Sequence, residues 1–236
     1  MNGFREHSTR SNHCKNLLSA YLAHKMHLIL INYWASPLTM PIDHSSELSH
    51  HFLVAMPSLD DLNFKHAVIY VCEHNEEGAM GLIINKPLQI NLGNVLHHLN
   101  IDVTDKSSES HPVLMGGPVG QEHGFIIHNE LSFLSEKTKR EVDANPDDHT
   151  ELVISSSKEM LSSIAQGKGP AQYLVTLGYT GWEAGQLENE IAKNDWLVIP
   201  YDENILFKVP MELRWQMAPS SLGIDINQIS GHVGHA

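Results

Sequence analysis

The sequence predicts a single compact α+β domain, residues 48–236, preceded by an N-terminal extension, residues 1–47. Three observations support this fold class. Apolar residues make up 42% of the chain and charged residues 18%, which is the composition of a globular protein. Short β-branched runs bounded by glycine or proline predict strands, and apolar residues three and four positions apart predict helices. The 236 residues are enough for one good core.

The extension differs from the rest in charge. Residues 1–45 hold four of the 15 basic side chains and two of the 28 acidic ones. The remaining residues therefore hold 11 basic and 26 acidic side chains, which is a net charge of −15. The apolar stretch 17–34 is interrupted by polar residues, so it is too polar for a membrane-spanning helix. It also lacks the small-residue cleavage site of a signal peptide. We therefore expect a poorly ordered extension or one outside the natural product, with Met40 as an alternative initiator.

Strand patterns recur along the domain, each rich in β-branched or aromatic residues. The sequence HNEEG at 74–78 is typical of a turn, so the runs before and after it predict a hairpin. The segment 178–182 (GYTGW) also predicts a turn. The expected strands are residues 50–57, 67–72, 81–85, 113–115, 125–127, 152–155, 173–177 and 196–199.

Helical patterns predict segments at about 92–99, 156–166 and 186–193, and one that begins near Met211. Ser156 and Glu159 have the spacing of a capping box, in which the hydroxyl accepts from a free amide and the carboxylate reaches back. Pro219 is expected to break the last helix, because proline removes an amide donor and clashes with the preceding turn.

The stretch 113–128 (VLMGGPVGQEHGFIIH) organises the chain. It predicts two short strands joined by a tight, strained connection at Gly116, Gly117 and Pro118. Glycine permits positive φ and close approach of another backbone or a ligand, and proline excludes a central ladder position. One interpretation is a backbone pocket that cradles a ligand. The other, which we favour, is a bulge or sheet corner, since glycines inside strand patterns usually mark one of these.

The charge of the domain bears on its partners. An acidic surface repels a phosphate backbone, and the sequence shows no basic helix and no zinc-finger spacing, so direct nucleic-acid binding is disfavoured. Two cysteines, Cys14 and Cys72, give no disulfide framework, so we expect a reducing compartment and a cytoplasmic protein without a membrane segment. The 17 histidines include the pairs 50–51 and 97–98, but there is no HExxH or CxxC spacing. We expect no metal site and no cofactor.

Motifs that carry chemistry are scarce. The serines at 155–157 lack the GxSxG elbow of a hydrolase, and there is no P-loop or paired-carboxylate signal. Lys86, within the motif Asn85-Lys86-Pro87 (NKP), could bind an anion or act as a base if desolvated, although a surface lysine is the commoner case. Trp182 could line a pocket or simply pack at a turn. The candidate ligand cleft therefore comprises Asn85, Lys86, Gly116, Gly117 and Trp182.

Five motifs in order, HHFLVAMPSL, VIYVCEHNEEGAMGLIINKP, VLMGGPV, LGYTGWEAGQLENEI and NDWLVIP, closely resemble the bacterial YqgE/AlgH family. The resemblance covers about residues 48–236. It implies a single α+β domain with a mixed, folded-over sheet flanked by helices. Residues 1–45 lie outside the family pattern, and Pro219 interrupts a terminal helix that members usually continue. The AlgH name implies a regulator of alginate synthesis, but the resemblance implies no mechanism.

Two functions from different classes fit these observations. The first is a non-enzymatic regulatory or interaction protein with an unidentified protein partner, because the glycine-rich motifs have no catalytic companions. The alternative is a small-anion-binding protein or enzyme whose cleft lies near the NKP and Gly116-Gly117-Pro118 (GGP) motifs. A direct transcription factor ranks third, because of the acidic charge.

Overall fold

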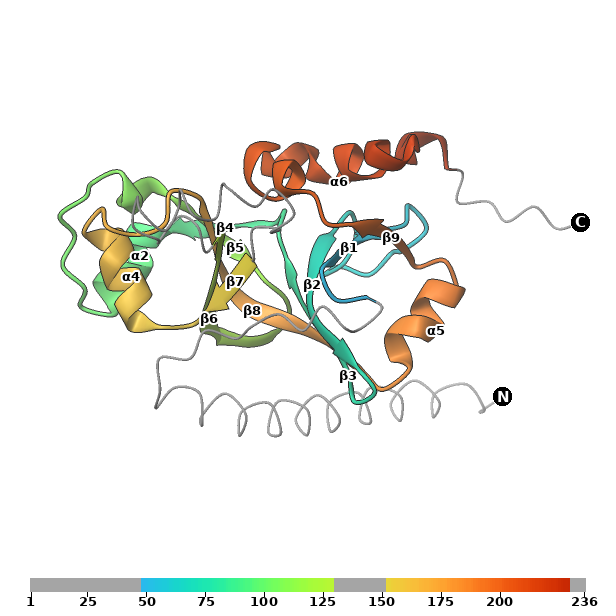
Figure 1. Ribbon diagram of the computed structural model, residues 1–236, viewed down its shortest axis with the longest axis horizontal. Helices are drawn as coiled ribbons and strands as arrows, with labels where there is room; N and C mark the ends of the chain where they lie inside the picture. The colour runs from blue at the N-terminus through green and yellow to red at the C-terminus, as the bar shows by residue number, and fades with distance from the viewer. Residues whose placement is uncertain (1–47, 130–151, 230–236) are drawn as a thin grey trace, which may run out of the picture. The chain divides into compact units, whose positions relative to one another are not determined.

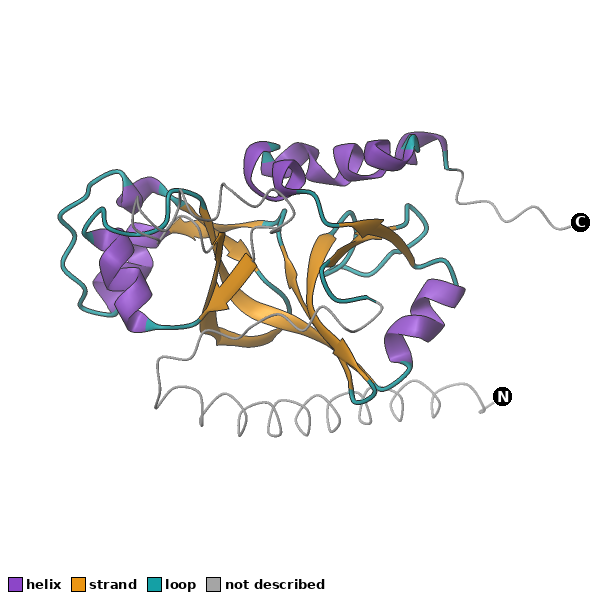
Figure 2. Ribbon diagram, viewed as in Figure 1, coloured by secondary structure: helices purple, strands orange, loops and turns teal. Residues whose placement is uncertain are grey.

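A computed structural model describes residues 48–129 and 152–229, and the predictions made for residues 1–47 lie outside these ranges (Figures 1 and 2). The described strands form one mixed nine-stranded sheet, in which β5 and β8 run parallel and the other neighbours antiparallel. The strands are β1 His51–Ala55, β2 Val68–Asn75, β3 Gly78–Ile83, β4 Pro87–Asn91, β5 Pro112–Met115, β6 Val119–Asn129, β7 Leu152–Ser155, β8 Tyr173–Glu183 and β9 Trp196–Pro200.

Helices pack against this sheet, so the predicted α+β class with flanking helices is confirmed (Figure 2). The α-helices are α2 Leu92–His98, α4 Lys158–Ala165, α5 Gln186–Ala192 and α6 Arg214–Met217. Shorter helical turns are η1 Ser108–Ser110, a π-helical turn Asn204–Lys208, η4 Met211–Leu213, η5 Ala218–Leu222 and η6 Ile226–Gln228.

The sheet folds over along β8, which is shared by two groups of strands (Figure 1). Its first half pairs with β5 on one edge and β6 on the other, and its second half pairs with β3. Beyond β3 the order continues through β2 and β1 to β9, and β7 extends the sheet from β6. The segment 178–182, predicted as a turn, lies inside this strand, so that prediction was wrong. Gly178 takes a positive φ of 75° and lets the strand bend without ending.

Two hydrophobic cores form on the two parts of the sheet. One joins β1, β2, β3 and α5, with Leu53, Ile69 and Leu187 almost completely buried. The other joins β5, β6 and β8 to helices α2 and α4, with Leu96 and Ile164 at its centre. Helix α2 buries the apolar face that its sequence spacing indicated, which is the usual way a short helix is stabilised.

Most predicted elements occur where the pattern placed them, and the hairpin β2–β3 is confirmed by its pairing from Asn75 with Gly78 onward. The start of α4 differs by one position. The N-cap is Ser157, whose hydroxyl accepts from Met160 N at 3.1 Å, so the predicted capping box of Ser156 and Glu159 does not form. Serine is a favoured N-cap residue, and the next serine along the chain takes the position.

The C-terminal helical run, residues 211–222, changes type along its length. The α-helical part ends at Met217, and the chain continues as a 3-10 helix in which Pro219 takes an early position that needs no amide donor. Pro219 therefore ends the α-helix, as predicted, but the helical path extends to Leu222 and stops at Gly223 with a φ of 72°. Among the described helices, none is long and apolar enough to cross a membrane.

Candidate functional site

The NKP and GGP motifs meet where the ends of β3 and β5 reach β8. Ile83 N donates to Gly116 O and Met115 N donates to Lys86 O, both at 2.8 Å. Two segments 30 residues apart in the sequence are therefore joined through their backbones. This contact brings together four of the five candidate residues predicted from the sequence.

The GGP motif carries the chain from the edge of β8 that holds β5 to the edge that holds β6. A Cβ on Gly116 would lie 2.2 Å from Gly178 O, and a Cβ on Gly117 would lie 2.1 Å from the carbonyl carbon of Tyr179. Neither glycine has a positive φ. The connection therefore fits the favoured interpretation, a sheet corner. It was also predicted to be strained, but the φ angles of its two glycines show no such strain. Glycine is needed there because two backbones touch.

Asn85 uses its side chain to join two segments of the fold. Its Oδ1 accepts from Val68 N at 2.8 Å and its Nδ2 donates to His66 O at 2.8 Å. Both the acceptor and a donor of the amide are therefore engaged in holding the start of β2 beside the end of β3. The arrangement stabilises the backbone around Lys86 and leaves little of the Asn85 side chain for a ligand.

Lys86 is half-buried and donates from Nζ to Asn63 O at 2.7 Å. Burial lowers the pKa of its ammonium, and the nearby Asp61 carboxylate opposes that shift. That carboxylate already accepts from the amides of Asn63 and Phe64. Within the described ranges Lys86 forms no ion pair. A partly buried lysine whose pKa is shifted is a feature found at functional sites.

Trp182 has a separate role. Its indole lies in the core of β1, β2, β3 and α5, 4% exposed, and packs edge to face on Trp196 with ring centroids 6.1 Å apart. The Nε1 atoms of both tryptophans donate to Glu190 Oε2 at 2.9 Å, and Gln186 Nε2 donates to Glu190 Oε1. Trp182 therefore takes the structural role that was weighed against a pocket role, and Glu190 is the polar anchor of this core.

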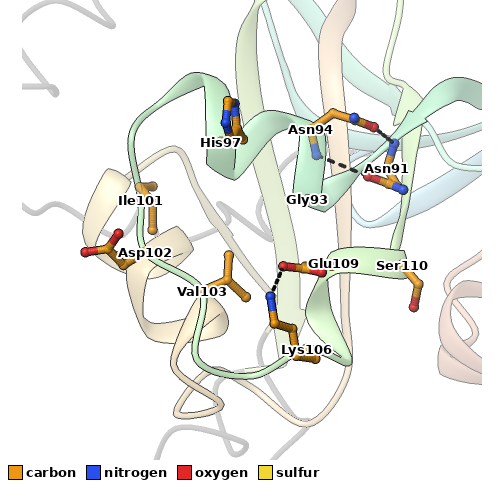
Figure 3. A pocket seen from close by; sticks show the side chains of 10 residues that line it. All are labelled: Asn91, Gly93, Asn94, His97, Ile101, Asp102, Val103, Lys106, Glu109 and Ser110. Carbon is orange, nitrogen blue, oxygen red and sulfur yellow. Dashed lines mark hydrogen bonds and ion pairs between the residues drawn. The ribbon is translucent and has the colours of Figure 1, made fainter.

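A groove lies elsewhere, between α2 and the chain that follows it, with a volume of about 740 Å³ (Figure 3). Its walls alternate polar and apolar groups, and several polar ones are already paired. Asn91 and Asn94 form a reciprocal capping box, and Lys106 Nζ pairs with Glu109 Oε1 at 2.8 Å. The lining residues are Asn91, Gly93, Asn94, His97, Ile101, Asp102, Val103, Lys106, Glu109 and Ser110. The groove offers hydrogen-bonding edges for a ligand and no nucleophile paired with a base.

Exposed apolar side chains gather on the C-terminal helical run. Five large apolar residues are exposed in the described part of the chain, and three of them, Leu213, Met217 and Leu222, lie within this run at 43–46% exposure. Leu213 and Met217 are four positions apart and so lie on one side of it. The opposite side is anchored, since Trp215 Nε1 donates to Ala55 O at 2.8 Å. We call Leu213, Met217 and Leu222 the apolar stripe.

Other groups with reactive chemistry are buried or dispersed. Cys72 is buried, and burial raises the pKa of its thiol, which makes the nucleophilic thiolate scarce. No cluster of three or more His, Cys, Asp or Glu side chains suited to a metal occurs among the residues that the structure describes.

Arg214 is a candidate that the sequence did not single out. Its side chain is 3% exposed, and its Nη1 donates to Ile84 O, directly before the NKP motif. A lone arginine in a helical pattern gives no signal of such a contact, because 130 residues separate the two partners. The spacing of Leu213 and Met217, in contrast, could have indicated an outward apolar face.

A family model described as AlgH-like matches residues 52–227, the part of the chain that holds the NKP and GGP motifs. The chain belongs to the AlgH-like family. Its relatives include a UPF0301 protein of Coxiella burnetii, 54% identical over 189 residues, which cover 80% of this chain and 97% of the relative. A UPF0301 protein of Legionella pneumophila is 43% identical over 81% of this chain and 98% of its own length.

Solved structures agree with this family. The AlgH protein of Pseudomonas aeruginosa, solved in solution, is 41% identical with a TM-score of 0.62, and the match covers 84% of this chain and all of that one. A protein of Corynebacterium diphtheriae, 20% identical with a TM-score of 0.52 over 74% of this chain and 88% of its own, shares the fold. The mixed, folded-over sheet implied by the sequence motifs is thus the fold of the AlgH-like family.

Proposed function

We propose that this AlgH-like protein is a non-enzymatic regulatory protein that acts by binding a protein partner through the apolar stripe. The observation that supports this is the concentration of exposed apolar residues on one anchored helical run. Contiguous exposed apolar patches on soluble domains commonly mark interaction sites. The inner side of the run is held by Arg214 and Trp215, so the stripe is presented on a rigid support.

Charge indicates the kind of partner. The chain carries a net charge of −13, and Glu212, next to the stripe, is exposed. A second copy would carry the same charge, so long-range repulsion opposes self-association. A partner with an apolar centre and a basic rim is complementary in both respects. The lack of a disulfide framework supports a reducing compartment, so we seek this partner among cytoplasmic proteins.

The test places a photo-crosslinking amino acid at Met217 in the full chain and irradiates producing cells. We expect one discrete adduct heavier than the chain, identified by mass spectrometry as a second protein. The matched control carries the same crosslinker at Ala192, an exposed position at the end of α5, and is expected to give no such adduct.

A second variant separates binding from folding. Leu213→Ser, in the chain with the crosslinker at Met217, removes the neighbouring apolar side chain without touching the buried side of the run. It should greatly reduce the adduct while the melting temperature stays the same. The proposal fails if no adduct forms, if Ala192 gives the same adduct, or if the adduct has twice the mass of the chain.

A further inference from the structure

The groove beside α2 has the size and the ordered walls of a binding site. Its volume of about 740 Å³ lies within the range of about 300–1,000 Å³ that small-molecule sites occupy. The wall opposite α2, residues 101–110, is tied to two helices. Ile101 N donates to Leu96 O in α2 at 2.9 Å, and Asp105 N donates to Ala165 O in α4, also at 2.9 Å. The groove is therefore preformed, which lowers the entropy cost of binding.

Apolar side chains form the inner side of the groove. Ile101 is 9% exposed and belongs to the core of β5, β6, β8, α2 and α4, and Val103 packs against that core. Both residues also line the groove (Figure 3). A ligand with an apolar group of matching size can cover this surface and remove it from water, which favours binding.

An ion pair in the wall has unused hydrogen-bonding capacity. Lys106 Nζ donates to Glu109 Oε1 at 2.8 Å, and the two side chains are 78% and 42% exposed (Figure 3). Within the described part of the chain, the ammonium uses one of its three donors and Glu109 Oε2 accepts from no group. Glu109 is held close to α2, because a Cβ on Gly93 would lie 3.1 Å from Glu109 Cβ. The pair thus offers an ordered carboxylate oxygen and further N–H donors to a ligand.

Two side-chain amides add donors on the α2 side of the groove. Asn91 Oδ1 accepts from Asn94 N at 3.1 Å, and Asn94 Oδ1 accepts from Asn91 N at 2.9 Å. The capping box therefore uses both side-chain oxygens and leaves both Nδ2 groups without an acceptor among the described residues. The groove thus supplies donors that suit a carboxylate and, at Glu109, an acceptor that suits an ammonium.

We propose that this groove binds a free α-amino acid with an apolar side chain. The carboxylate of the ligand accepts from Lys106, with the asparagine amides as further donors along the same groove, and its ammonium donates to Glu109 Oε2. The side chain of the ligand covers Ile101 and Val103. A ligand with a charge of one sign meets a like charge in the Lys106–Glu109 pair, whereas a zwitterion adds a second ion pair to the first. This site is separate from the apolar stripe and does not depend on it.

The first measurement is calorimetric titration of the full-length protein with L-valine, L-leucine, L-isoleucine and L-methionine. We expect saturable binding of at least one of them and a rise in melting temperature, since a ligand of the native state stabilises it. The deaminated and decarboxylated analogues of the tightest ligand keep its side chain but carry only one charge. Each should bind at least about tenfold more weakly, because a hydrogen bond to a charged group contributes on that order. Glycine, which has no side chain to cover the apolar surface, should also bind more weakly.

Two substitutions test the assignment to the ion pair. Glu109→Gln and Lys106→Gln each remove one charge, and each should lower the affinity for the amino acid at least about tenfold. The melting temperature without ligand should change little, because exposed ion pairs contribute little to stability. Lys65→Gln is the matched control, since it breaks the exposed pair with Asp60 on another loop, and its affinity should stay within about twofold of the wild type.

Several results would overturn the proposal. No amino acid of the panel gives saturable heat, or an analogue with one charge, or glycine, binds as tightly as the tightest ligand. The same conclusion follows if Glu109→Gln or Lys106→Gln binds like the wild type. It also follows if Lys65→Gln loses as much affinity as these variants, because the effect would then be one of general surface charge.

Discussion

Replacement of Gly117 by alanine tests the contact at which the sheet folds over. The added Cβ would lie 2.1 Å from both the carbonyl carbon and the oxygen of Tyr179, and 2.6 Å from Thr180 N. These are backbone atoms of β8, which is hydrogen-bonded to β6 and β3 at its edges. To restore a separation of 3.0 Å, the crossing chain and β8 must move apart by about 0.9 Å.

The cost follows from the rigidity of that contact. Overpacking a well-packed site costs typically about 1–3 kcal/mol and sometimes more. No flexible side chain can yield at Gly117, so we expect the upper end, about 3 kcal/mol. In a chain of this size about 1 kcal/mol shifts the melting temperature by about 2–4 °C, so the expected decrease is about 6–12 °C.

Urea denaturation followed by circular dichroism measures this free energy. The control is Gly181→Ala in the same strand, where the nearest atom to the new Cβ is Tyr179 Cε2 at 3.7 Å and φ is not positive. We expect that variant to be unchanged or more stable by about 0.4–1 kcal/mol, because alanine restricts the unfolded chain. Equal stabilities of Gly117→Ala and the wild type would refute the argument from close approach.

Two further predictions concern half-buried polar side chains. Glu190→Leu should destabilise the protein by about 2–4 kcal/mol, since the Nε1 groups of Trp182 and Trp196 lose their acceptor, whereas Glu190→Gln retains an acceptor and should cost much less in the same urea assay. An equal loss in both variants would contradict this. Burial lowers the pKa of His111, a shift that its backbone hydrogen bond with Tyr173 opposes, so the unfolded chain binds the extra proton more readily and the unfolding free energy falls as the pH drops below about 6.5. His111→Phe, which keeps the ring stacked on Tyr173, should lose less stability between about pH 7.5 and about pH 5 than the wild type, and an identical loss would exclude His111 as a source of the acid sensitivity.

Sequence patterns were sufficient where local physics decides the outcome. The alternation and β-branching of β2 and β3, with a turn sequence between them, predicted their hairpin, and the apolar spacing of α2 predicted its buried face. The same reasoning failed at residues 178–182, because glycines that usually end a strand here let β8 bend and receive the crossing chain. A strand or turn propensity describes a single segment of the chain, whereas the conformation of residues 178–182 depends on two segments that touch.

The candidate site shows the same division. The sequence selected Asn85, Lys86, Gly116 and Gly117, which the fold does join, because residues with special backbone or charge requirements are visible in a pattern. It also selected Trp182, whose hydrogen bond to Glu190 assigns it to a core. Whether Lys86 binds a ligand stays a prediction.

The sequence by itself determined the α+β class, the family, most strands and helices, and the need for glycine at the GGP motif. Tertiary structure alone decided that β8 serves two groups of strands, that NKP and GGP are neighbours, and that Arg214 reaches Ile84. The physical reason is the separation along the sequence over which each effect acts. Periodicity, turn chemistry and composition act over a few residues, whereas these contacts join residues 29 to 130 positions apart and form only when both cores pack.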